Sequence, residues 1–423
     1  MPKKEYEWED GSIIEDHSLA KHEALREYLI RFVKALSPNP MQEKINLDIV
    51  DGFSGGGIYN TSSGNLHLGS PLIILESLKE AEAACTAYRK DMHKVKDFQV
   101  IGDKYFIDSC KYAIQSLNQT LDSYGYRSRI DQDIHVIQNT FHDALPILLK
   151  KLNQKRCKVI FLLDQYGYKD ATLAHIKQIF STLGNRAEVI LTLSTDNIIS
   201  YISEDPRYKT ALKNAGIDHI ITDEVIEQFR SAPGLNKKLE RIAIQYTIAS
   251  AYHKESGATW GNSLFIRSQK SNRAYLYLHL SNNFRAREEM NQVFWETSNE
   301  IVQDAGHGIS MFEYDPENDI QSGFDFTFDD QSGSLTVEAL QTELLDKFHS
   351  YNQEIISVQS FIQDAIQTAT PAGLNHFQKA LFDLSQYGEL GIKTKDGGSR
   401  QKANSVKLTD KLIRPKQKVI SFK

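Results

Sequence analysis

The stretch "DGFSGGG" occupies Asp51 to Gly57 and directly follows the apolar run "INLDIV", Ile45 to Val50. Ordering a glycine costs more conformational entropy than ordering any other residue, so a triple glycine indicates a backbone that must come close to a ligand or a neighbour. Dinucleotide-binding loops, P-loops and methyl-donor loops all carry glycines at this place. The stretch therefore predicts a strand followed by a loop that lies close to a ligand or to a neighbouring part of the chain. It does not by itself identify which of these the loop contacts.

Around this loop, short apolar runs alternate with stretches of helix length. The helical stretches include "SLAKHEALREYLIRFVKAL", "SPLIILESLKEAEAA", "YFIDSCKYAIQSLNQTL" and "DATLAHIKQIFSTLG". The strand-length runs are Ile45–Asp51, Phe98–Asp103, Ile134–Ile137, Val159–Asp164, Glu188–Ser194, Ser263–Arg267 and Ala274–Leu280. This alternation predicts an α/β fold with a largely parallel sheet. Only "SQKSNR" separates the last two runs, so we expect them to form an antiparallel hairpin at the sheet edge.

Polar residues stand at the ends of these predicted strands. Asp51, Asp103 and Asp164 each end a run, and Asn139-Thr140 follows another. In open α/β sheets, ligands bind beyond the carboxyl ends of the strands. A single aspartate at a strand end often only caps a turn. The ordered set beside three glycines nevertheless predicts a concave polar site.

The glycine loop itself favours one class of ligand. A P-loop requires a Gly-Lys-Ser/Thr ending, and "SGGGIYN" has no lysine. A dinucleotide loop runs directly into a helix whose N-terminus holds the pyrophosphate, whereas "GGGIYNTSSGNLHLGSP" delays the next helix. A ligand without phosphates, such as S-adenosylmethionine, fits better, with Asp103 expected on its ribose and Thr140 and Phe141 beside its adenine. The predicted donor-binding residues are Lys21, Asp51, Phe53, Gly55, Gly57, Asp103, Thr140 and Phe141.

The fourth predicted strand ends in "LDQYGY", which suggests a methyl-acceptor site. Asp164 could accept a hydrogen bond from an exocyclic amine, and Tyr166 or Tyr168 could stack on an extruded base. The alternative is that both tyrosines pack under the next helix. We expect Asp164, Tyr166 and Tyr168 to be the catalytic residues.

Composition limits the classes of protein to which the chain can belong. It has 423 residues, 40% of them hydrophobic, with a net charge of −6 and no apolar run of membrane-spanning length. The N-terminus is polar and lacks the apolar core of a signal peptide, so a cytoplasmic protein is expected. The three cysteines have no metal-type spacing, which predicts free thiols and no metal site.

Basic residues are concentrated at the C-terminus. Residues 391–423 carry ten Lys+Arg against two Asp+Glu, while the other 390 residues have a balance of −14. A helical stretch, "LNHFQKALFDLSQYGEL", precedes strand-like "LGIKT" and "SVKLT", as in a winged helix. Arg400, Lys402 and Lys407 are expected to contact nucleic-acid phosphates; a protein-docking winged helix is the alternative. The expected domains are residues 1–300, an acidic linker at 301–335, and a winged helix with a basic tail at 336–423.

Motifs along most of the chain resemble the three-Cys-motif partner (TcmP) family of bacterial methyltransferase-like proteins. They are "HSLAKHEALREYL", "DGFSGGG", "GSPLIILESL", "FLLDQYGY", "LTLSTDNIISYI", "YLYLHLSNNFRAREEMNQVFW" and "FQKALFDLSQYGELGIKTKDGGSRQKANSVKLTDKLI". The resemblance implies a class I, Rossmann-like methyltransferase fold, a winged-helix tail and a radical-SAM-like protein partner. Two motifs depart from the family: the glycine loop lacks a frequent proline, and "DQYGY" replaces Asp-Pro.

These observations favour an S-adenosylmethionine-dependent methyltransferase acting on nucleic acid, at a base amino group. A non-catalytic methyltransferase-like module that binds nucleic acid or a protein is the second hypothesis. A methyltransferase for small molecules or proteins is the third. Donor binding and turnover would separate the first two, and salt-sensitive binding to DNA or RNA would separate the first from the third.

Overall fold

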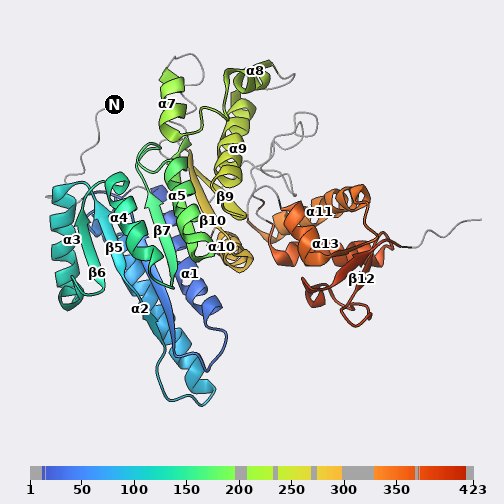
Figure 1. The fold of residues 1–423 in the computed structure, drawn as a ribbon, viewed down its shortest axis with the longest axis horizontal. Helices are drawn as coiled ribbons and strands as arrows, with labels where there is room; N and C mark the ends of the chain where they lie inside the picture. The colour runs from blue at the N-terminus through green and yellow to red at the C-terminus, as the bar shows by residue number, and fades with distance from the viewer. Residues whose placement is uncertain are drawn as a thin grey trace, which may run out of the picture. The chain divides into compact units, whose positions relative to one another are not determined.

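The structure, a computed structural model, describes residues 12–14, 16–195, 207–231, 237–267, 274–297, 328–366, 370 and 372–415. The chain divides into two compact units, residues 1–303 and residues 304–423 (Figure 1). Each unit has its own buried apolar core.

The first unit is built on an eight-stranded mixed sheet. Its strands are β1 (Lys44–Asp51), β4 (Gln99–Ile101), β5 (Lys104–Asp108), β6 (Ile134–Gln138), β7 (Lys158–Asp164), β8 (Ala187–Ser194), β9 (Trp260–Arg267) and β10 (Ala274–Ser281). The order is β6-β5-β1-β7-β8-β10-β9, with β4 paired to the beginning of β1. Strand β10 is antiparallel to both neighbours, and the strands from β6 to β8 are parallel. This is the arrangement of a Rossmann-like class I methyltransferase sheet, and it confirms the predicted fold class.

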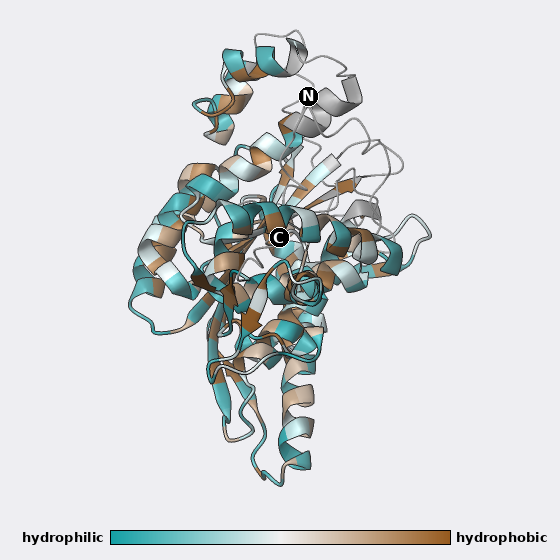
Figure 2. Cartoon of the chain, turned by 90° about the vertical axis from the view of Figure 1, so that its right-hand side faces the viewer, coloured by the Kyte–Doolittle hydropathy of each residue, from teal (hydrophilic) through white to brown (hydrophobic). Residues whose placement is uncertain are grey.

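Helices cover both faces of this sheet. Because parallel crossovers are right-handed, the helices that follow β1 and β5 lie on one face and those that follow β6 and β7 lie on the other. The first face carries α1 (Asp16–Leu36), α2 (Ser70–Asp91), α3 (Lys111–Ser123) and α10 (Phe284–Thr297). The second carries α4 (Phe141–Asn153), α5 (Leu173–Leu183) and α9 (Lys237–Glu255). Figure 2 shows helices that carry both hydrophilic and hydrophobic residues, as expected for amphipathic helices on a sheet.

The remaining described elements of this unit are short. A hairpin of β2 (Ile58–Asn60) and β3 (Leu66–Leu68) occupies the stretch between the glycine loop and α2, which explains why that helix is delayed. Helices α7 (Arg207–Ala215) and α8 (Asp223–Ser231) precede α9, and single 3-10 turns occur at η1 (Arg127–Arg129) and η2 (Gly184–Arg186).

The prediction for the second strand of the parallel sheet is wrong. The predicted strand Phe98–Asp103 contains only the short β4, and the stretch predicted as helix from Tyr105 begins as β5. Gly102 causes the difference: its φ is 149°, and a Cβ at this position would lie 2.2 Å from the carbonyl oxygen of Leu47. The chain therefore bends closely against β1 at Gly102 and then continues as the strand that ends at Asp108.

The second unit has winged-helix topology, as predicted. Its elements are α11 (Asp330–Ser350), β11 (Ile355–Ser357), α12 (Val358–Ala365), α13 (Leu374–Gln386), β12 (Gly391–Lys393), η5 (Ala403–Ser405) and β13 (Lys411–Ile413), with strand order β11-β13-β12. The strand expected over "SVKLT" is instead a 3-10 turn and a loop, and the paired strand begins at Lys411. Gln378 of α13 binds the Val406 carbonyl at 2.6 Å and so holds this loop against the helix. Most of the expected linker at 301–335 lies outside the described residues.

Two properties expected from composition can be compared with the structure. None of the helices in the described part of the chain has the length and hydropathy that a membrane crossing requires. The three cysteines are free thiols; Cys85 and Cys157 are buried, and Cys110 is half-buried.

Candidate functional site

The glycine loop lies at the carboxyl end of β1 and is tied to the end of β5. Ser54 donates its backbone N–H to the Ile107 carbonyl at 2.9 Å, and Gly55 donates to the Asp108 carboxylate at 3.0 Å. Gly55 has a φ of 59°, in the left-handed region where a side chain introduces strain. At Gly52, by contrast, a Cβ would lie 2.9 Å from both Leu163 and Phe141, so this glycine permits close packing. The loop therefore has a fixed course over two strand ends.

Asp51 ends β1 and is fully buried. Its carboxylate accepts a hydrogen bond of 2.6 Å from the Ser70 hydroxyl at the start of α2, and one of 3.2 Å from the Phe53 N–H. Burial raises the pKa of Asp51 to about 7; these two hydrogen bonds lower it, and the Asp164 and Asp108 charges raise it. Asp51 therefore titrates near neutral pH, with no lysine or arginine paired to it among the described residues.

Asp164 ends β7 and forms an ion pair with Lys21 of α1. The Lys21 ammonium lies 2.7 and 2.8 Å from the two carboxylate oxygens, and 5.8 Å from the ring centre of Tyr275. Burial alone would raise the pKa of Asp164, but Lys21 holds it below its ordinary value. The Lys21 side chain is 7% exposed and that of Asp164 is 25% exposed. Lys21 was predicted to bind the methyl donor, and Asp164 was predicted to bind the methyl acceptor. The structure pairs these two residues with each other.

A buried glutamine side chain closes the loop after β7. The buried Gln165 amide accepts from the backbone N–H groups of Asp170 and Ala171, both at 3.0 Å, and donates to the Ala171 carbonyl at 2.9 Å. Tyr166 projects from this closed loop and is 56% exposed, whereas Tyr168 is half-buried. For Tyr166, packing under the next helix is therefore excluded, and its ring is accessible for stacking.

Asp103 does not lie at this edge of the sheet, contrary to the prediction. It precedes β5 and accepts hydrogen bonds of 2.7 Å from both Lys155 and Tyr105. Its backbone N–H binds Asp48 at 2.7 Å. Burial raises its pKa, but the bonds from Lys155 and Tyr105 outweigh this and leave the pKa of Asp103 well below its ordinary value. Asp103 is therefore part of a charge cluster at the amino end of the strands.

Asp108 occupies the position that was assigned to Asp103. It ends β5 beside the glycine loop, and its carboxylate accepts from the N–H groups of Gly55, at 3.0 Å, and Cys110, at 2.7 Å. Sequence reasoning missed it because the predicted strand was ended at Asp103. The signal that could have found it is "KYFIDS", a second apolar run that also ends in aspartate.

The aromatic residues expected near an adenine lie together. Phe53 and Phe141 have ring centres 5.8 Å apart, and Phe141 is buried. Thr140 is exposed and caps α4 by accepting from the Asp143 N–H at 3.1 Å. Phe141 also contacts His175, which sequence reasoning did not single out. These residues form the side of the site next to β6.

A histidine pair lies on the other side of the site. His22 follows Lys21 on α1, and its Nδ1 lies 3.0 Å from Nε2 of His67 on β3, with the rings stacked. Burial lowers the pKa of His22 to about 3, so this imidazole is neutral at physiological pH. The hairpin of β2 and β3 is thereby attached to α1. The side chain of His17, at the start of α1, lies outside the described residues.

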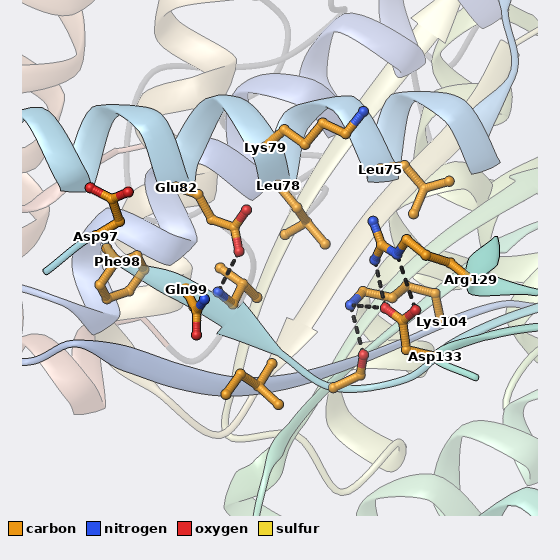
Figure 3. Close-up of a pocket in the computed structure, with 13 residues that line it drawn as sticks. Leu75, Leu78, Lys79, Glu82, Asp97, Phe98, Gln99, Lys104, Arg129 and Asp133 are labelled. Atoms are coloured by element: carbon orange, nitrogen blue, oxygen red, sulfur yellow. Dashed lines mark hydrogen bonds and ion pairs between the residues drawn. The ribbon is translucent and has the colours of Figure 1, made fainter. Parts of the chain in front are cut away.

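A hollow of about 470 Å³ lies elsewhere, between α2 and the region from β4 to the start of β5 (Figure 3). Its polar lining is internally paired: Arg129 and Lys104 both bind Asp133, Lys104 also binds the Gly102 carbonyl, and Glu82 accepts from the Val100 N–H. This hollow is at the amino end of the strands, away from Asp51 and Asp164.

The wing is the segment from β12 to β13, residues 391–413, and the predicted phosphate-binding residues in it differ in their surroundings. Arg400 forms two hydrogen bonds of 2.7 Å with the buried Asp410, so it holds the wing together and its guanidinium is already engaged. Lys402 and Lys407 are exposed. Sequence reasoning missed a further pair: Lys393 on β12 lies directly opposite Lys411 on β13, and both are exposed.

Comparisons with known proteins agree with the architecture of the second unit. A family model described as a GMT-like wHTH domain matches residues 313–397. Among curated protein sequences, no match to the chain was found. The chain is similar to cofactor-bound Rv0187 from MTB, with 11% identity and a TM-score of 0.29, over 61% of this chain and 80% of that chain. It is also similar to the plantazolicin methyltransferase BamL, solved with a triazolic desmethylPZN analog and SAH, with 12% identity and a TM-score of 0.26, over 63% of this chain and 86% of that chain.

Proposed function

We propose that the first unit is an S-adenosylmethionine-dependent methyltransferase. The observation that carries this proposal is the set of carboxylates at the carboxyl edge of the class I sheet: Asp51, Asp108 and Asp164. In the described residues, Lys21 pairs with Asp164, and Asp51 has no cationic partner. A ligand with a sulfonium and an ammonium group would supply the missing positive charge, because an opposite charge nearby favours the ionised carboxylate.

The residues of this edge fit such a donor. The glycine loop would lie against the methionine part, and Asp51 would stabilise its positive charge. Asp108 would accept hydrogen bonds from the ribose hydroxyls, in the role first expected of Asp103. Phe53 and Phe141 would flank the adenine. When bound, the donor would supply an electrophilic methyl group.

Asp164 is proposed to orient the acceptor nitrogen. It would accept a hydrogen bond from that nitrogen while the nitrogen–carbon bond forms and the carbon–sulfur bond breaks, and water would take the proton that the nitrogen loses. To do so, Asp164 must exchange its Lys21 partner for the acceptor. The exposed Tyr166 would stack on the acceptor ring.

Donor binding tests this assignment. Titration calorimetry should show that S-adenosylhomocysteine binds the wild-type chain, and that Asp108→Ala weakens binding by about 1–3 kcal/mol, the typical value for a hydrogen bond to a charged group. Asp103→Asn, the matched control at the opposite edge, should leave the affinity unchanged. If the wild-type chain does not bind the donor or its product, the methyltransferase proposal fails.

We further propose that the acceptor is nucleic acid, bound by the wing. The ion pairs in the described part of this unit join Lys347 to Asp364, Lys379 to Asp383 and Arg400 to Asp410. The exposed lysines that remain outside these pairs are Lys393, Lys395, Lys402, Lys407 and Lys411. Like charges directly opposite on two strands repel, so Lys393 and Lys411 favour an anion between them. Phosphate groups of a nucleic-acid backbone meet this requirement.

The salt dependence of binding tests the wing. Replacing Lys393 and Lys411 together by Gln should weaken binding to DNA or RNA and reduce the log–log salt slope by about 0.7–0.9 for each phosphate that is no longer neutralised. Lys379→Gln on α13 is the matched control, because that lysine is already paired with Asp383 at 2.6 Å. An unchanged slope in the double variant would favour a wing that docks a protein.

A non-catalytic binding module remains the second candidate, and the observation that favours it is the Lys21–Asp164 ion pair, which occupies the proposed acceptor carboxylate. Donor binding without methylation of any nucleic acid would support this candidate. Membership of the three-Cys-motif partner family and the radical-SAM-like partner rest on the sequence motifs, and they stay predictions.

A further inference from the structure

Tyr277 on β10 has an unpaired polar atom in a buried place. Its side chain is 1% exposed, and its hydroxyl has no hydrogen-bond partner among the described residues. Leaving a buried hydroxyl unpaired costs about 1–3 kcal/mol. Such groups in native proteins call for an explanation, commonly a function or a bound molecule that is not in view.

The register of the sheet places Tyr277 next to the proposed acceptor carboxylate. Asp164 is the direct neighbour of Thr192 across β7 and β8, and Thr192 is the direct neighbour of Tyr277 across β8 and β10. Residues paired in this way share a face of the sheet, here the face that α1 covers. The three side chains therefore form one row at the carboxyl edge.

Electrostatics supports this proximity. Burial raises the pKa of Tyr277, and the Asp164 charge raises it further. The phenol therefore stays protonated at physiological pH and can donate a hydrogen bond. Asp164, whose pKa lies below its ordinary value, is ionised and can only accept one.

Lys21 lies over this row. Its ammonium binds Asp164 and lies 5.8 Å from the ring centre of Tyr275, which is two residues from Tyr277 on the same face. Of the two paired side chains, Asp164 is the more exposed, at 25% against 7% for Lys21. An amine that reached Tyr277 would thus replace the Lys21 ammonium on Asp164.

We propose that Asp164 and Tyr277 together select an acceptor whose amino group lies beside a ring nitrogen, as in adenine or cytosine. The amino group would donate to Asp164, and the neighbouring ring nitrogen would accept from the Tyr277 hydroxyl. Thymine has no amino group, and an alkylamine has no adjacent acceptor. This inference rests on the proposed methyltransferase function, and it names the substrate class of the same site.

The test compares two buried tyrosines in the full-length chain. Tyr277→Phe removes only the unpaired hydroxyl. Tyr252→Phe is the matched control, because the Tyr252 hydroxyl is buried and donates to the Ala215 carbonyl at 3.2 Å. Binding of single-stranded poly(dA), poly(dC) and poly(dT) is measured in the presence of S-adenosylhomocysteine, together with donor affinity and Tm.

Wild-type protein should bind poly(dA) and poly(dC) more tightly than poly(dT). Tyr277→Phe should weaken the first two by about 5- to 50-fold, leave poly(dT) unchanged, and leave Tm equal or higher, since no hydrogen bond is lost. Tyr252→Phe should lower Tm and keep the base preference. An unchanged preference in Tyr277→Phe, or binding of none of the polymers, overturns the inference. Donor binding in the same samples shows separately whether the methyltransferase proposal stands.

Discussion

The two edges of the parallel sheet both carry buried or half-buried aspartates, but the charges around them differ. At the amino edge, Lys155 binds Asp48 and Asp103, each at 2.7 Å, while Arg129 and Lys104 bind Asp133. At the carboxyl edge, Asp51 is held by a hydroxyl and a backbone N–H, and Asp108 accepts from two backbone N–H groups.

This difference distinguishes carboxylates that stabilise the fold through ion pairs from carboxylates that are available to a ligand. A carboxylate that is fully paired at the amino edge has a lowered pKa, as at Asp103, and stabilises the fold. A buried carboxyl without a cation, as at Asp51, has a raised pKa and opposes folding when ionised. Raised pKa values of this kind are typical of functional sites. By this criterion Asp51 is the aspartate of the carboxyl edge to connect with chemistry, whereas Asp164 at the same edge is already paired with Lys21.

The largest expected effect is on folding, at the amino edge. Gly102→Ala would place a Cβ 2.2 Å from a backbone oxygen of β1, at a φ of 149°. We expect a loss of about 3–5 kcal/mol in the free energy of unfolding, because backbone on both sides must shift. Urea denaturation measures it. A loss below about 1 kcal/mol would show that the amino edge tolerates rearrangement and is not a rigid structural cluster.

The matched glycine at the carboxyl edge should affect binding more than folding. Gly55→Val adds a branched side chain at a φ of 59° in the proposed donor loop. The strain should cost about 1–2 kcal/mol of stability, while affinity for S-adenosylhomocysteine should fall about 100-fold, or roughly 2.7 kcal/mol. Calorimetry on the folded variant checks this, and unchanged affinity would remove the loop from the site.

Asp51→Asn should change the pH dependence of stability. The folded-state pKa of about 7 lies above the unfolded value of about 3.9, so the wild-type folded state keeps a proton that the unfolded state loses between pH 4 and 7. The protonated Asp51 carboxyl therefore contributes to the stability of the wild-type protein at low pH, and this contribution is lost as the pH rises from 4 to 7. The variant should gain about 4 kcal/mol relative to wild type from pH 4 to pH 8, as measured by urea denaturation. His22 titrates in both proteins, so its effect cancels, and a difference independent of pH would contradict the assignment.

The smallest effect is expected from the central cation of the amino edge. Lys155→Met leaves Asp48 and Asp103 without their shared partner, and should lower stability by about 1–2 kcal/mol because the lysine is only partly buried. Donor affinity should stay within twofold, measured by the same titration. A clear loss of donor affinity would show that the two edges are coupled, and would remove the distinction between a structural edge and a ligand-binding edge.

Local sequence pattern was enough to predict most of the fold. The alternation of apolar runs and amphipathic stretches predicted the parallel strands, and "SQKSNR" predicted the β9–β10 hairpin. The pattern failed at Gly102, where a close approach to β1 interrupts one run and the strand resumes with a buried lysine, Lys104. A charged residue at a strand start gives no apolar signal, so the strand end was placed at Asp103 instead of Asp108.

Pairings between distant residues could not be predicted from the sequence. Lys21 and Asp164 are 143 residues apart, and only the docking of α1 on the sheet brings them together. Arg400 and Asp410 are only ten residues apart and bind each other. A count of charges nevertheless treats Arg400 as free, because the sequence does not show that the Asp410 carboxylate is buried. The unpaired hydroxyl of Tyr277 likewise appears only once the neighbours of β10 are known.

The position of α1 also has a consequence for synthesis on the ribosome. Tyr28 of α1 bonds to His279 of β10 at 2.9 Å, across 251 residues of chain. At 5–20 residues per second, β10 leaves the ribosome on the order of ten to fifty seconds after α1. During that interval, α1 lacks the contacts that it makes with β10 and α10 in the finished fold. A nascent chain stalled before β10 should therefore be cleaved by protease within α1, whereas the released full-length chain should resist.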